Sequence, residues 1–510
     1  MGRINTNIQS LITQRVLGAN NATLAQSLER LSTGFRVNRG KDDPAGLIAS
    51  EALRVEQKGL NAAISNAERA DQVSNIAEGS LQEVSSLLTE LQGMLTETAS
   101  RAGLSAQERS ANQLQIDSIL QTIERISSSA NFQGTKLLNG NLDFRVSSIA
   151  SGISDYRVGA ARYNSATLGV DVLVTASAQQ GGIFLSFGAT SLDLTTGSSL
   201  VLDIGGTRGS RELSFASGTS LAKIRDAINA FSDVTGLTAA VSGTGIRLAT
   251  TEFGSSEYVS VRTVNAAGIA SGSSGIHRLR AGNFAAAATN GTDGAGSETE
   301  FSGATNGVRD QGQDIGAIIN GVVATGKGRT ARVSSDALDA EVTLTSARAQ
   351  QLGSVGGSSS SFTIVGGGAE FHLGQRVDIG GRLTIGVPAV STRTLGNATV
   401  GYLDRLGSGK ANNAVNGDLN GAQKIVAEAI SQVSAVRGRL GTFQKNIVGA
   451  TIRSLGVAVE NTAAANSVIR DADFATETAQ LTRSQILVSA SINVMQLANN
   501  APQSALQLLG

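Results

Sequence analysis

The stretch LSTGFRVNRGKDDPAGLIAS (residues 31–50) decides how the N-terminal part of this chain folds, because it interrupts a sequence that otherwise predicts continuous helix. Before it, leucines recur every seven residues, at positions 17, 24 and 31, and after it apolar residues from 64 to 95 again fall at helical spacing. Inside it, Asp43 can cap a helix, and Pro44 suits a first helical position because no backbone N–H is needed there. We therefore predict two helices separated by a turn that contains Gly34 and Gly40, with the second helix starting near residue 44.

The composition excludes several kinds of site and partner. The 510 residues include 41 basic and 41 acidic side chains, so the neutral net charge gives no reason to expect nucleic acid or an anionic membrane surface as a partner. Because cysteine is absent, disulfides, thiolate metal ligands and a cysteine nucleophile are excluded. No run of about 18 apolar residues occurs, and the first residues lack the apolar core of a signal peptide, so we expect neither a membrane span nor a secretory leader.

Glycine content divides the chain into two helical ends and a different middle. Most of the 61 glycines lie in 141–410, where short apolar and Gly/Ser/Thr-rich segments predict strands and turns. The ends carry coiled-coil spacing. Steps of three and four separate Ile116, Ile119, Ile123 and Ile126, and also Leu481, Gln485, Val488, Ile492 and Met495, and the same seven-residue frame fits Val426, Ile430, Val433, Leu440 and Ile447. These stripes could face one ordinary globular core. Because each stripe is narrow and flanked by polar residues, the pattern favours N-terminal helices that pair with C-terminal helices.

The middle of the chain contains one recognisable supersecondary unit. Residues 200–215 predict two strands joined by a turn, 220–231 an amphipathic helix, and 237–253 a second hairpin. Together they form a ββαββ unit at 200–264. A second strand-rich block follows at about 314–395.

No segment carries a convincing catalytic, cofactor or metal motif. Residues 321–328, GVVATGKG, resemble a phosphate-binding loop but lack the Ser or Thr that would hold magnesium, so a glycine-rich turn is the better interpretation. His277 and His372 are the only histidines, and neither has the spacing of a zinc ligand pair. No G-x-S-x-G sequence seats a serine nucleophile. We predict no enzyme activity and no cofactor.

Several separated motifs, in the correct order, closely resemble those of bacterial flagellins. The N-terminal signature corresponds to Leu31, Ser32, Gly34, Arg36, Asn38, Lys41, Asp42, Asp43, Ala45 and Gly46. The C-terminal motif corresponds to Asp471, Asp473, Phe474, Ala475, Glu477, Gln485, Ile486 and Leu487. The resemblance covers about 1–140 and 411–510, and 200–264 is similar to an insert unit of many flagellins and hook-associated proteins. Pro44 stands where the family usually has alanine, which should stiffen the helix restart without moving it.

The resemblance implies a structural subunit that self-assembles into the extracellular filament of the bacterial flagellum for swimming motility. The implied fold is α+β and multidomain. Residues 1–45 with 466–510 form an inner coiled coil, 46–175 with 396–465 the main helical domain with a small β part, and 176–395 a β-rich outer region. The implied partners are other copies of the chain, the flagellar cap, the hook–filament junction proteins, an export chaperone and the flagellar type III export apparatus.

Two alternative functions remain open from the sequence. A hook–filament junction protein of the same organelle has similar terminal helices, and the number of copies per filament separates it from a filament subunit. An enzyme-bearing flagellin would need a metal or nucleophile motif within 141–410, and none is evident there.

One motif of the family departs from its usual form. Many flagellins carry a Leu-Gln-Arg-x-Arg-Glu-Leu run that an animal toll-like receptor recognises, largely through the first arginine. The aligned segment here is Leu88-Thr-Glu90-Leu-Gln92-Gly93-Met94, so a glutamate replaces the first arginine and a glutamine the second. A carboxylate cannot supply the donors of a guanidinium. We expect the soluble monomer to stimulate the receptor weakly or not at all.

Overall fold

The computed structural model describes residues 6–100, 103–163, 166–194, 199–266, 268–269, 274–278, 299–335, 337–357 and 360–507. The chain divides into two compact units. Unit 1 consists of Met1–Gln72, His372–Gly381 and Phe443–Gly510, and unit 2 of Val73–Phe371 and Arg382–Thr442. The long helix α2 (Pro44–Thr98) contributes residues to both units. Among the residues that the structure describes, no helix is long and apolar enough to cross a membrane.

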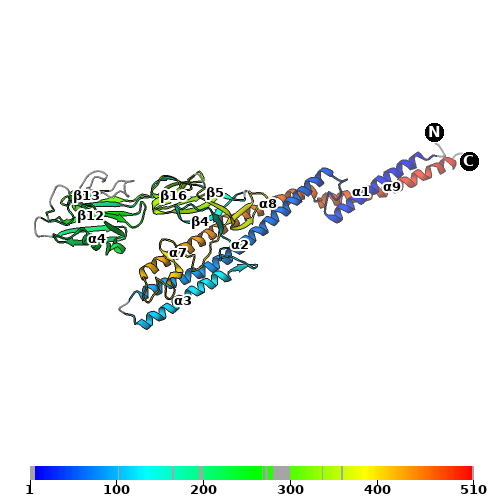
Figure 1. Ribbon diagram of the computed structural model, residues 1–510. Coiled ribbons are helices and arrows are strands. Elements are labelled where there is room, and N and C mark those ends of the chain that lie inside the picture. Colours follow the sequence, from blue (N-terminus) through cyan, green and yellow to red (C-terminus); the bar gives the residue numbers. More distant parts are fainter. Residues whose placement is uncertain are drawn as a thin grey trace. The chain divides into compact units, whose positions relative to one another are not determined.

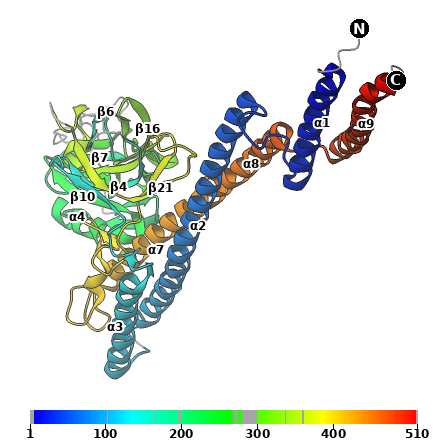
Figure 2. The same ribbon diagram turned by 90° about the vertical axis from the view of Figure 1, so that its right-hand side faces the viewer.

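Unit 1 is built from helices at the two ends of the sequence. Helix α1 (Ile8–Thr33) runs antiparallel to α9 (Phe474–Gln507), and the first part of α2 runs antiparallel to α8 (Gly449–Arg470) (Figures 1 and 2). A π-helical turn, η3 (Phe443–Val448), precedes α8. The predicted pairing of N-terminal with C-terminal helices is confirmed.

The helix boundaries of unit 1 follow from capping residues. The side chain of Asn7 accepts a hydrogen bond from Ser10 N and caps α1, and Gly34 ends that helix with a φ of 75°. At the start of α2, Asp43 Oδ1 accepts a hydrogen bond from Gly46 N at 2.8 Å. The predicted helix restart at Pro44 is therefore confirmed. Gly40 does not adopt a positive φ, so only Gly34 supplies the left-handed conformation in this turn.

The helical part of unit 2 contains the rest of α2, α3 (Ala106–Ser129) and α7 (Leu419–Thr442). Its core positions recur at steps of three and four and include Leu81, Val84, Leu88, Leu91, Ile116, Ile119, Ile123, Val426, Val433 and Leu440. Ile126 and Ile430 are half-buried at the edge of this core.

The prediction that Ile447 continues the seven-residue frame of the C-terminal helices is wrong. Ile447 is exposed, and Val448 is buried in its place. The reason is the π-helical turn at 443–448, because a π-helical turn bonds residue i to i+5 and shifts the following positions by one residue.

The β part of unit 2 next to the helices contains a nine-stranded sheet of order β19-β6-β15-β16-β17-β18-β4-β22-β21 and a three-stranded sheet of order β3-β20-β5. Their bounds are β3 (Phe144–Ser147), β4 (Ile153–Ala161), β5 (Leu168–Val170), β6 (Val172–Ala176), β15 (Gly316–Ile319), β16 (Val322–Lys327), β17 (Thr330–Ser334), β18 (Leu338–Leu344), β19 (Gly353–Ser354), β20 (Phe362–Gly367), β21 (Ala369–His372) and β22 (Arg382–Ile385). The 321–328 segment was expected to be a glycine-rich turn, but Val322–Lys327 form strand β16 and only Gly321 and Gly328 lie in turns.

Short elements connect the helices and sheets of unit 2. They are β1 (Asn131–Phe132), β2 (Thr135–Lys136), α6 (Ser346–Ala349), β23 (Gly396–Asn397), β24 (Gly401–Tyr402) and the 3-10 turn η2 (Leu403–Leu406).

A second β module lies between β6 and β15 in the sequence and has its own hydrophobic core. It contains two four-stranded sheets of order β10-β11-β7-β13 and β14-β12-β8-β9. Its elements are β7 (Gly182–Phe187), β8 (Leu200–Gly206), β9 (Gly209–Phe215), α4 (Leu221–Asn229), α5 (Ser232–Thr235), β10 (Leu237–Ser242), β11 (Gly245–Thr250), β12 (Tyr258–Asn265), β13 (Ser274–Arg278), η1 (Ala304–Asn306) and β14 (Val308–Gln311). The predicted ββαββ order is confirmed, and so is the α+β fold class.

Candidate assembly surface

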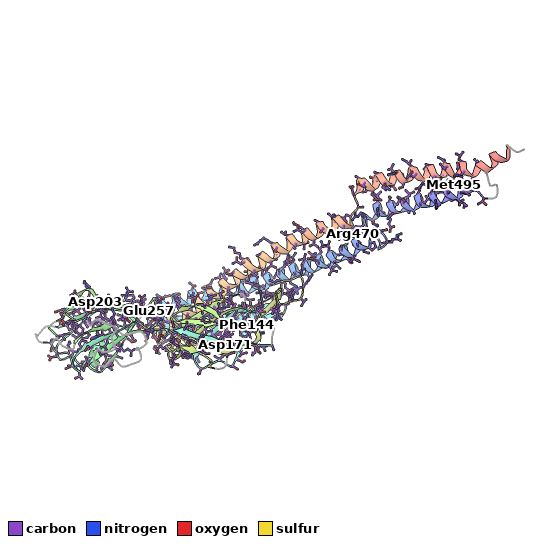
Figure 3. The ribbon with its side chains drawn as sticks, turned by 90° about the horizontal axis from the view of Figure 1, so that it is seen from above. Phe144, Asp171, Asp203, Glu257, Arg470 and Met495 are labelled. Atoms are coloured by element: carbon purple, nitrogen blue, oxygen red, sulfur yellow. The ribbon has the colours of Figure 1, made fainter. Side chains whose placement is uncertain are left out.

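Helices α1 and α9 meet along a seam of regularly spaced residues. In α1 the buried or half-buried residues that face this seam at regular spacing are Ser10, Thr13, Leu17, Asn20, Leu24, Ser27 and Leu31. In α9 they are Glu477, Leu481, Ser484, Val488, Ser491, Met495 and Ala498. Both sets advance by steps of three and four, as in a coiled coil, and Figure 3 labels Met495 on α9. The seam therefore alternates bulky aliphatic residues with small or polar ones.

Side-chain hydrogen bonds fix the register of this seam. Asn7 Nδ2 donates to Ala498 O at 2.8 Å, and Ser10 Oγ donates to Asn499 Oδ1 at 2.7 Å. Further along, Asn20 Nδ2 donates to Ser491 Oγ at 2.7 Å. Because a one-turn slip would break all three bonds, the polar residues set which parts of the helices lie together.

The sequence placed two seam residues of α9 incorrectly. Gln485 and Ile492 were predicted on the apolar stripe, but both are exposed, and Ser484 and Ser491 occupy the seam instead. Small serines allow the two helices to approach closely, and the steps of three and four residues run in the opposite order from the predicted one.

Bulky aliphatic side chains on both helices point away from the seam. On α1 they are Ile8, Leu11 and Ile12, and on α9 they are Ile486, Leu487, Val494 and Leu497, all exposed. Burying one such side chain is worth about 1.5–3 kcal/mol. The paired ends of one copy therefore leave a large apolar surface uncovered, and the candidate residues Ile486 and Leu487 belong to it.

The turn between α1 and α2 is hydrogen-bonded to the turn between α8 and α9. Arg36 N donates to Arg470 O at 2.7 Å, and Ala472 N donates to Gly34 O at 2.9 Å. The guanidinium of Arg36 also donates to Ile469 O at 2.7 Å. These bonds bring together the N-terminal signature and the C-terminal motif, which lie more than 430 residues apart in the sequence. We call residues 34–43 with 469–473 the turn clamp.

Arg470 is the central side chain of the turn clamp (Figure 3). Its guanidinium carbon lies 4.6 Å from the centre of the Phe35 ring, and its Nη1 lies 3.7 Å from Glu51 Oε1. A cation over an aromatic face contributes about 0.5–1 kcal/mol at exposed sites. The sequence motif includes Arg470 only as a neighbour of Asp471, so its contact with Phe35 could not be predicted from spacing.

Carboxylates hold the backbone of the two turns. Asp42 Oδ2 accepts hydrogen bonds from Arg39 N at 2.9 Å and from Asn38 N at 3.3 Å. Asp473 accepts from Ala475 N and Thr476 N at the start of α9. The Arg39 N–H lowers the pKa of Asp42, and the Thr476 N–H lowers the pKa of Asp473.

Other candidate residues lie in or beside the turn clamp. Asn38 Nδ2 donates to Phe35 O, and a Cβ at Gly46 would clash with the carboxylate of Asp43, which explains the glycine. Asp471 accepts from Ser467 Oγ at 2.6 Å. Glu477 is buried, with Arg30 Nη1 at 3.8 Å from its Oε2. The remaining members are exposed, and they are Ser32, Lys41, Ala45, Phe474 and Ala475.

We expect the turn clamp to loosen at acid pH. A carboxylate whose pKa is lowered in the folded state stabilises the fold above its unfolded pKa, and this stabilisation is lost as the pH falls through the folded pKa. The midpoint of thermal unfolding, followed by circular dichroism, should therefore fall between about pH 4 and pH 2. Asp42→Asn combined with Asp473→Asn keeps an oxygen acceptor at each position, so the dependence should flatten. The control is Asp226→Asn on α4 of the second β module. If the pH dependence of the unfolding midpoint is the same in the double variant as in this control, the assignment is contradicted.

The segment aligned with the receptor motif lies on α2. Leu88, Leu91 and Met94 are buried, whereas Glu90 and Gly93 are exposed and Gln92 is half-buried. The structure thus places the reversed charge of Glu90 on the solvent side of the helix.

A charged cavity of about 350 Å³ lies in unit 2 between α7 and the sheet that contains β4 and β18. Burial raises the pKa of Asp143 and of Asp155 and lowers the pKa of Arg439. Arg157 Nη2 lies 3.3 Å from both Asp155 and Glu428, so acidic and basic groups are interleaved.

His277 is buried in β13, and the His372 ring contacts Arg376 O at 2.7 Å. In the described part of the chain, no group of three His, Asp or Glu side chains is placed to hold a metal ion.

Comparison with known proteins agrees with this geometry. Residues 4–143 match the bacterial flagellin N-terminal helical region, 423–509 the bacterial flagellin C-terminal helical region, and 199–252 the flagellin hook IN motif. The chain is 28% identical to B-type flagellin of Pseudomonas aeruginosa and to flagellin B of Helicobacter pylori, and 27% identical to flagellin of Salmonella typhimurium. Each of these alignments covers 99% of this chain and 99% of the relative.

Solved structures of other flagellar proteins are also similar in part. A flagellar hook associated protein-3 from Legionella pneumophila aligns at 11% identity and a TM-score of 0.24, covering 86% of this chain and 99% of that one. The D1-D2-D3 domains of the flagellar cap protein from Escherichia coli align at 17% identity and a TM-score of 0.25, covering 46% of this chain and 66% of that one. The family models, placed at both ends and in the insert, and the full-length relatives establish the identity. The chain belongs to the bacterial flagellin family.

Proposed function

We propose that the outward aliphatic faces of α1 and α9 form the polymerising surface of this flagellin. As a member of the family, the chain is a structural subunit that self-assembles into the extracellular filament of the bacterial flagellum. The observation that carries the proposal is the partly polar seam between α1 and α9, beside aliphatic side chains that one copy leaves uncovered. Neighbouring copies can bury those side chains, and this burial is the driving force for assembly.

The turn clamp has a positioning role in this proposal. Because its hydrogen bonds join the chain just after α1 to the chain just before α9, it fixes the end of α1 relative to the start of α9. We propose that its members set the path of the spoke that leads to the inner helices. Asp473 and Asp42 support this role by holding backbone N–H groups.

The domain division expected from the sequence fits the same proposal. Residues 1–45 with 466–510 would form the inner layer, 46–175 with 396–465 the main helical domain, and 176–395 the outer region. The pairing of α1 with α9 supports the inner layer, and the separate hydrophobic core of the second β module supports an outer region within 176–395.

Partners beyond other copies of the chain are part of the proposal. We expect contacts with the flagellar cap, with hook–filament junction proteins, with an export chaperone and with the type III export apparatus. A cysteine-free chain supports export in an unfolded state, because it cannot form disulfides on the way. Members of the family are structural proteins, and we propose no catalytic role for the charged cavity, whose acidic and basic groups compensate one another.

Seeded polymerisation tests the proposed function. Purified monomer is mixed with short filament fragments and observed by electron microscopy, and we expect long filaments that grow with monomer concentration. A product that stops at a short ring would instead favour a hook–filament junction protein. Monomer that never polymerises under any seeding condition would contradict the proposal.

We also expect this flagellin to stimulate the animal toll-like receptor weakly. Losing a buried interface arginine costs about 2–4 kcal/mol of binding free energy. Glu90, on the exposed side of α2, also places a negative charge against the receptor groups that would accept hydrogen bonds from an arginine. Signalling by the monomer should rise at least about tenfold when Glu90→Arg, Gln92→Arg and Gly93→Glu are combined. The matched control is Glu97→Arg, which makes the same charge change at another exposed position of α2. Strong signalling by the unmodified monomer would overturn the expectation.

A further inference from the structure

Helix α2 carries an apolar stripe on the face opposite its seam with α8. The stripe consists of Ile48, Ala52 and Val55, spaced by four and three residues, and Ile48 is 73% exposed. The seam side is marked by Ser50, which is fully buried and donates to Asn466 Oδ1 at 2.7 Å. Two residues along an α-helix are about 200° apart, so Ile48 and Ser50 point in nearly opposite directions.

Helix α8 carries a second stripe that matches the first. It consists of Val457, Asn461, Ala464 and Val468, spaced by four, three and four residues, and Val468 is 80% exposed. Asn466 again marks the seam side, two residues before Val468. The α2–α8 pair is therefore a two-helix layer with an exposed stripe on each outer edge, and both stripes are apolar apart from Asn461.

The two stripes lie at the same height along the layer. The helices are antiparallel, and Ser50 is level with Asn466 while Glu51 Oε1 lies 3.7 Å from Arg470 Nη1. This register places Ile48 level with Val468. Copies that repeat side by side can therefore bring one stripe against the other without a large shift along the helix axis.

A loop from a distant part of the chain extends the α2 stripe. One turn beyond Val55, a Cβ at Gly59 would lie 2.9 Å from the backbone oxygen of Gln375, so only glycine allows the loop to lie this close. Inside the loop, Leu373 N donates to Gly381 O at 2.7 Å, which holds its ends together. The loop presents Val377, which is 97% exposed. A loop fixed in this way holds an apolar side chain in water unless another molecule covers it.

We infer that the α2 stripe and Val377 of one copy pack against the α8 stripe of a neighbouring copy. This inference rests on the proposed function, because it names the contact that continues the layer in the filament. A helical filament requires heterologous contacts, in which one surface of a copy meets a different surface of the next copy. The α2 and α8 stripes are different surfaces whose residues follow the same steps of four and three, so they meet this requirement. Contact of like stripes would stop at a dimer.

Disulfide cross-linking tests the contact directly, because the chain has no cysteine of its own. Cysteines replace Ile48, Ala52 or Val55 on α2, each combined with a cysteine at 457, 461, 464 or 468 on α8, so that every overlapping register is covered. Disulfides form only when the two Cα atoms lie about 4.4–6.8 Å apart. After oxidation of filaments, we expect at least one pair to give a ladder of covalent oligomers on a denaturing gel. Each single-cysteine chain should give none.

The possible results separate this inference from the proposed function. Filaments without a ladder in any pair would overturn the contact alone, and covalent dimers from an α2 cysteine alone would show that like stripes meet. If the unmodified chain forms no filaments, the proposed function and the contact fail together.

Labelling of Val377→Cys gives an independent test. The matched control is Val323→Cys on β16, since Val323 is 78% exposed and lies in the nine-stranded sheet of unit 2. Assembly should slow maleimide labelling of Cys at 377 by at least about tenfold and leave the control unchanged. Equal labelling of the 377 variant in monomer and filament would overturn the role of the loop.

Discussion

Removing residues 471–510 is expected to abolish filament formation while leaving the helical and β parts of unit 2 folded. The deletion takes away α9, which supplies one side of the α1 seam and part of the outward aliphatic surface. It also removes Ala472, whose N–H bonds to Gly34 O in the turn clamp. Since α1 alone has no partner for Leu17 and Leu24, we expect it to lose its helical structure in the truncated monomer.

Point variants separate the outward face from the seam. Ile486→Ser combined with Leu497→Ser should leave the seam intact, because both side chains point away from it. Burial of each original side chain on assembly stabilises the filament by about 1.5–3 kcal/mol. Loss of both contributions should raise the critical concentration at least about a hundredfold. The control Gln496→Ala changes an exposed polar neighbour and should have little effect. Sedimentation and electron microscopy measure both results, and normal filaments from the 471–510 deletion would refute the inner-layer assignment.

Local features of the sequence predicted local features of the fold. Asp43 and Pro44 determine the start of α2 through capping and a fixed φ, which depend only on neighbouring residues. The ββαββ order followed in the same way from strand alternation and turn residues. Features that depend on distant residues could not be predicted, and the clearest case is the bond between Arg36 and the carbonyl of Ile469.

The candidate site shows the same limit. The sequence motifs selected residues at both turns, and the structure shows that backbone atoms make most of the bonds between them. Helical spacing placed Gln485 and Ile492 in the seam, because spacing alone cannot tell that close helix packing favours Ser484 and Ser491. The sequence also could not predict which strands share a sheet. The hairpins β8–β9 and β10–β11 follow one another in sequence but belong to different sheets.

The strand pairing also determines which part of the outer region can be deleted. The 200–264 unit is not self-contained, because β11 pairs with β7 and β12 pairs with β14 outside it. The module instead begins and ends where its two connecting segments pair with each other. There Gln179 N donates to Gln313 O at 2.8 Å, and Gln313 N donates to Gln179 O at 2.9 Å. Its core combines residues from within 200–264 with others outside, such as Ile183, Leu185, Phe187, Ile276 and Phe301.

Deleting residues 181–311 is therefore expected to leave a folded chain that still polymerises, whereas deleting 200–264 should unfold the remainder of the module. In the first variant, β6 and β15 already pair, with Gly316 opposite Ala176, so joining Gln180 to Gly312 closes a hairpin between them. Between α7 and the module, Lys424 Nζ lies 3.2 Å from Asp233 Oδ1 in an exposed ion pair. Such a pair is worth about 0–1 kcal/mol, so its loss matters little. In the second variant, exposure of three or more core side chains costs about 2–5 kcal/mol each, enough to unfold what is left. Limited proteolysis and thermal unfolding should show a resistant core and a cooperative transition only for the 181–311 deletion, and electron microscopy should show its filaments. Cooperative unfolding of the 200–264 deletion with a protected 181–199 segment would show that the module boundaries are wrong.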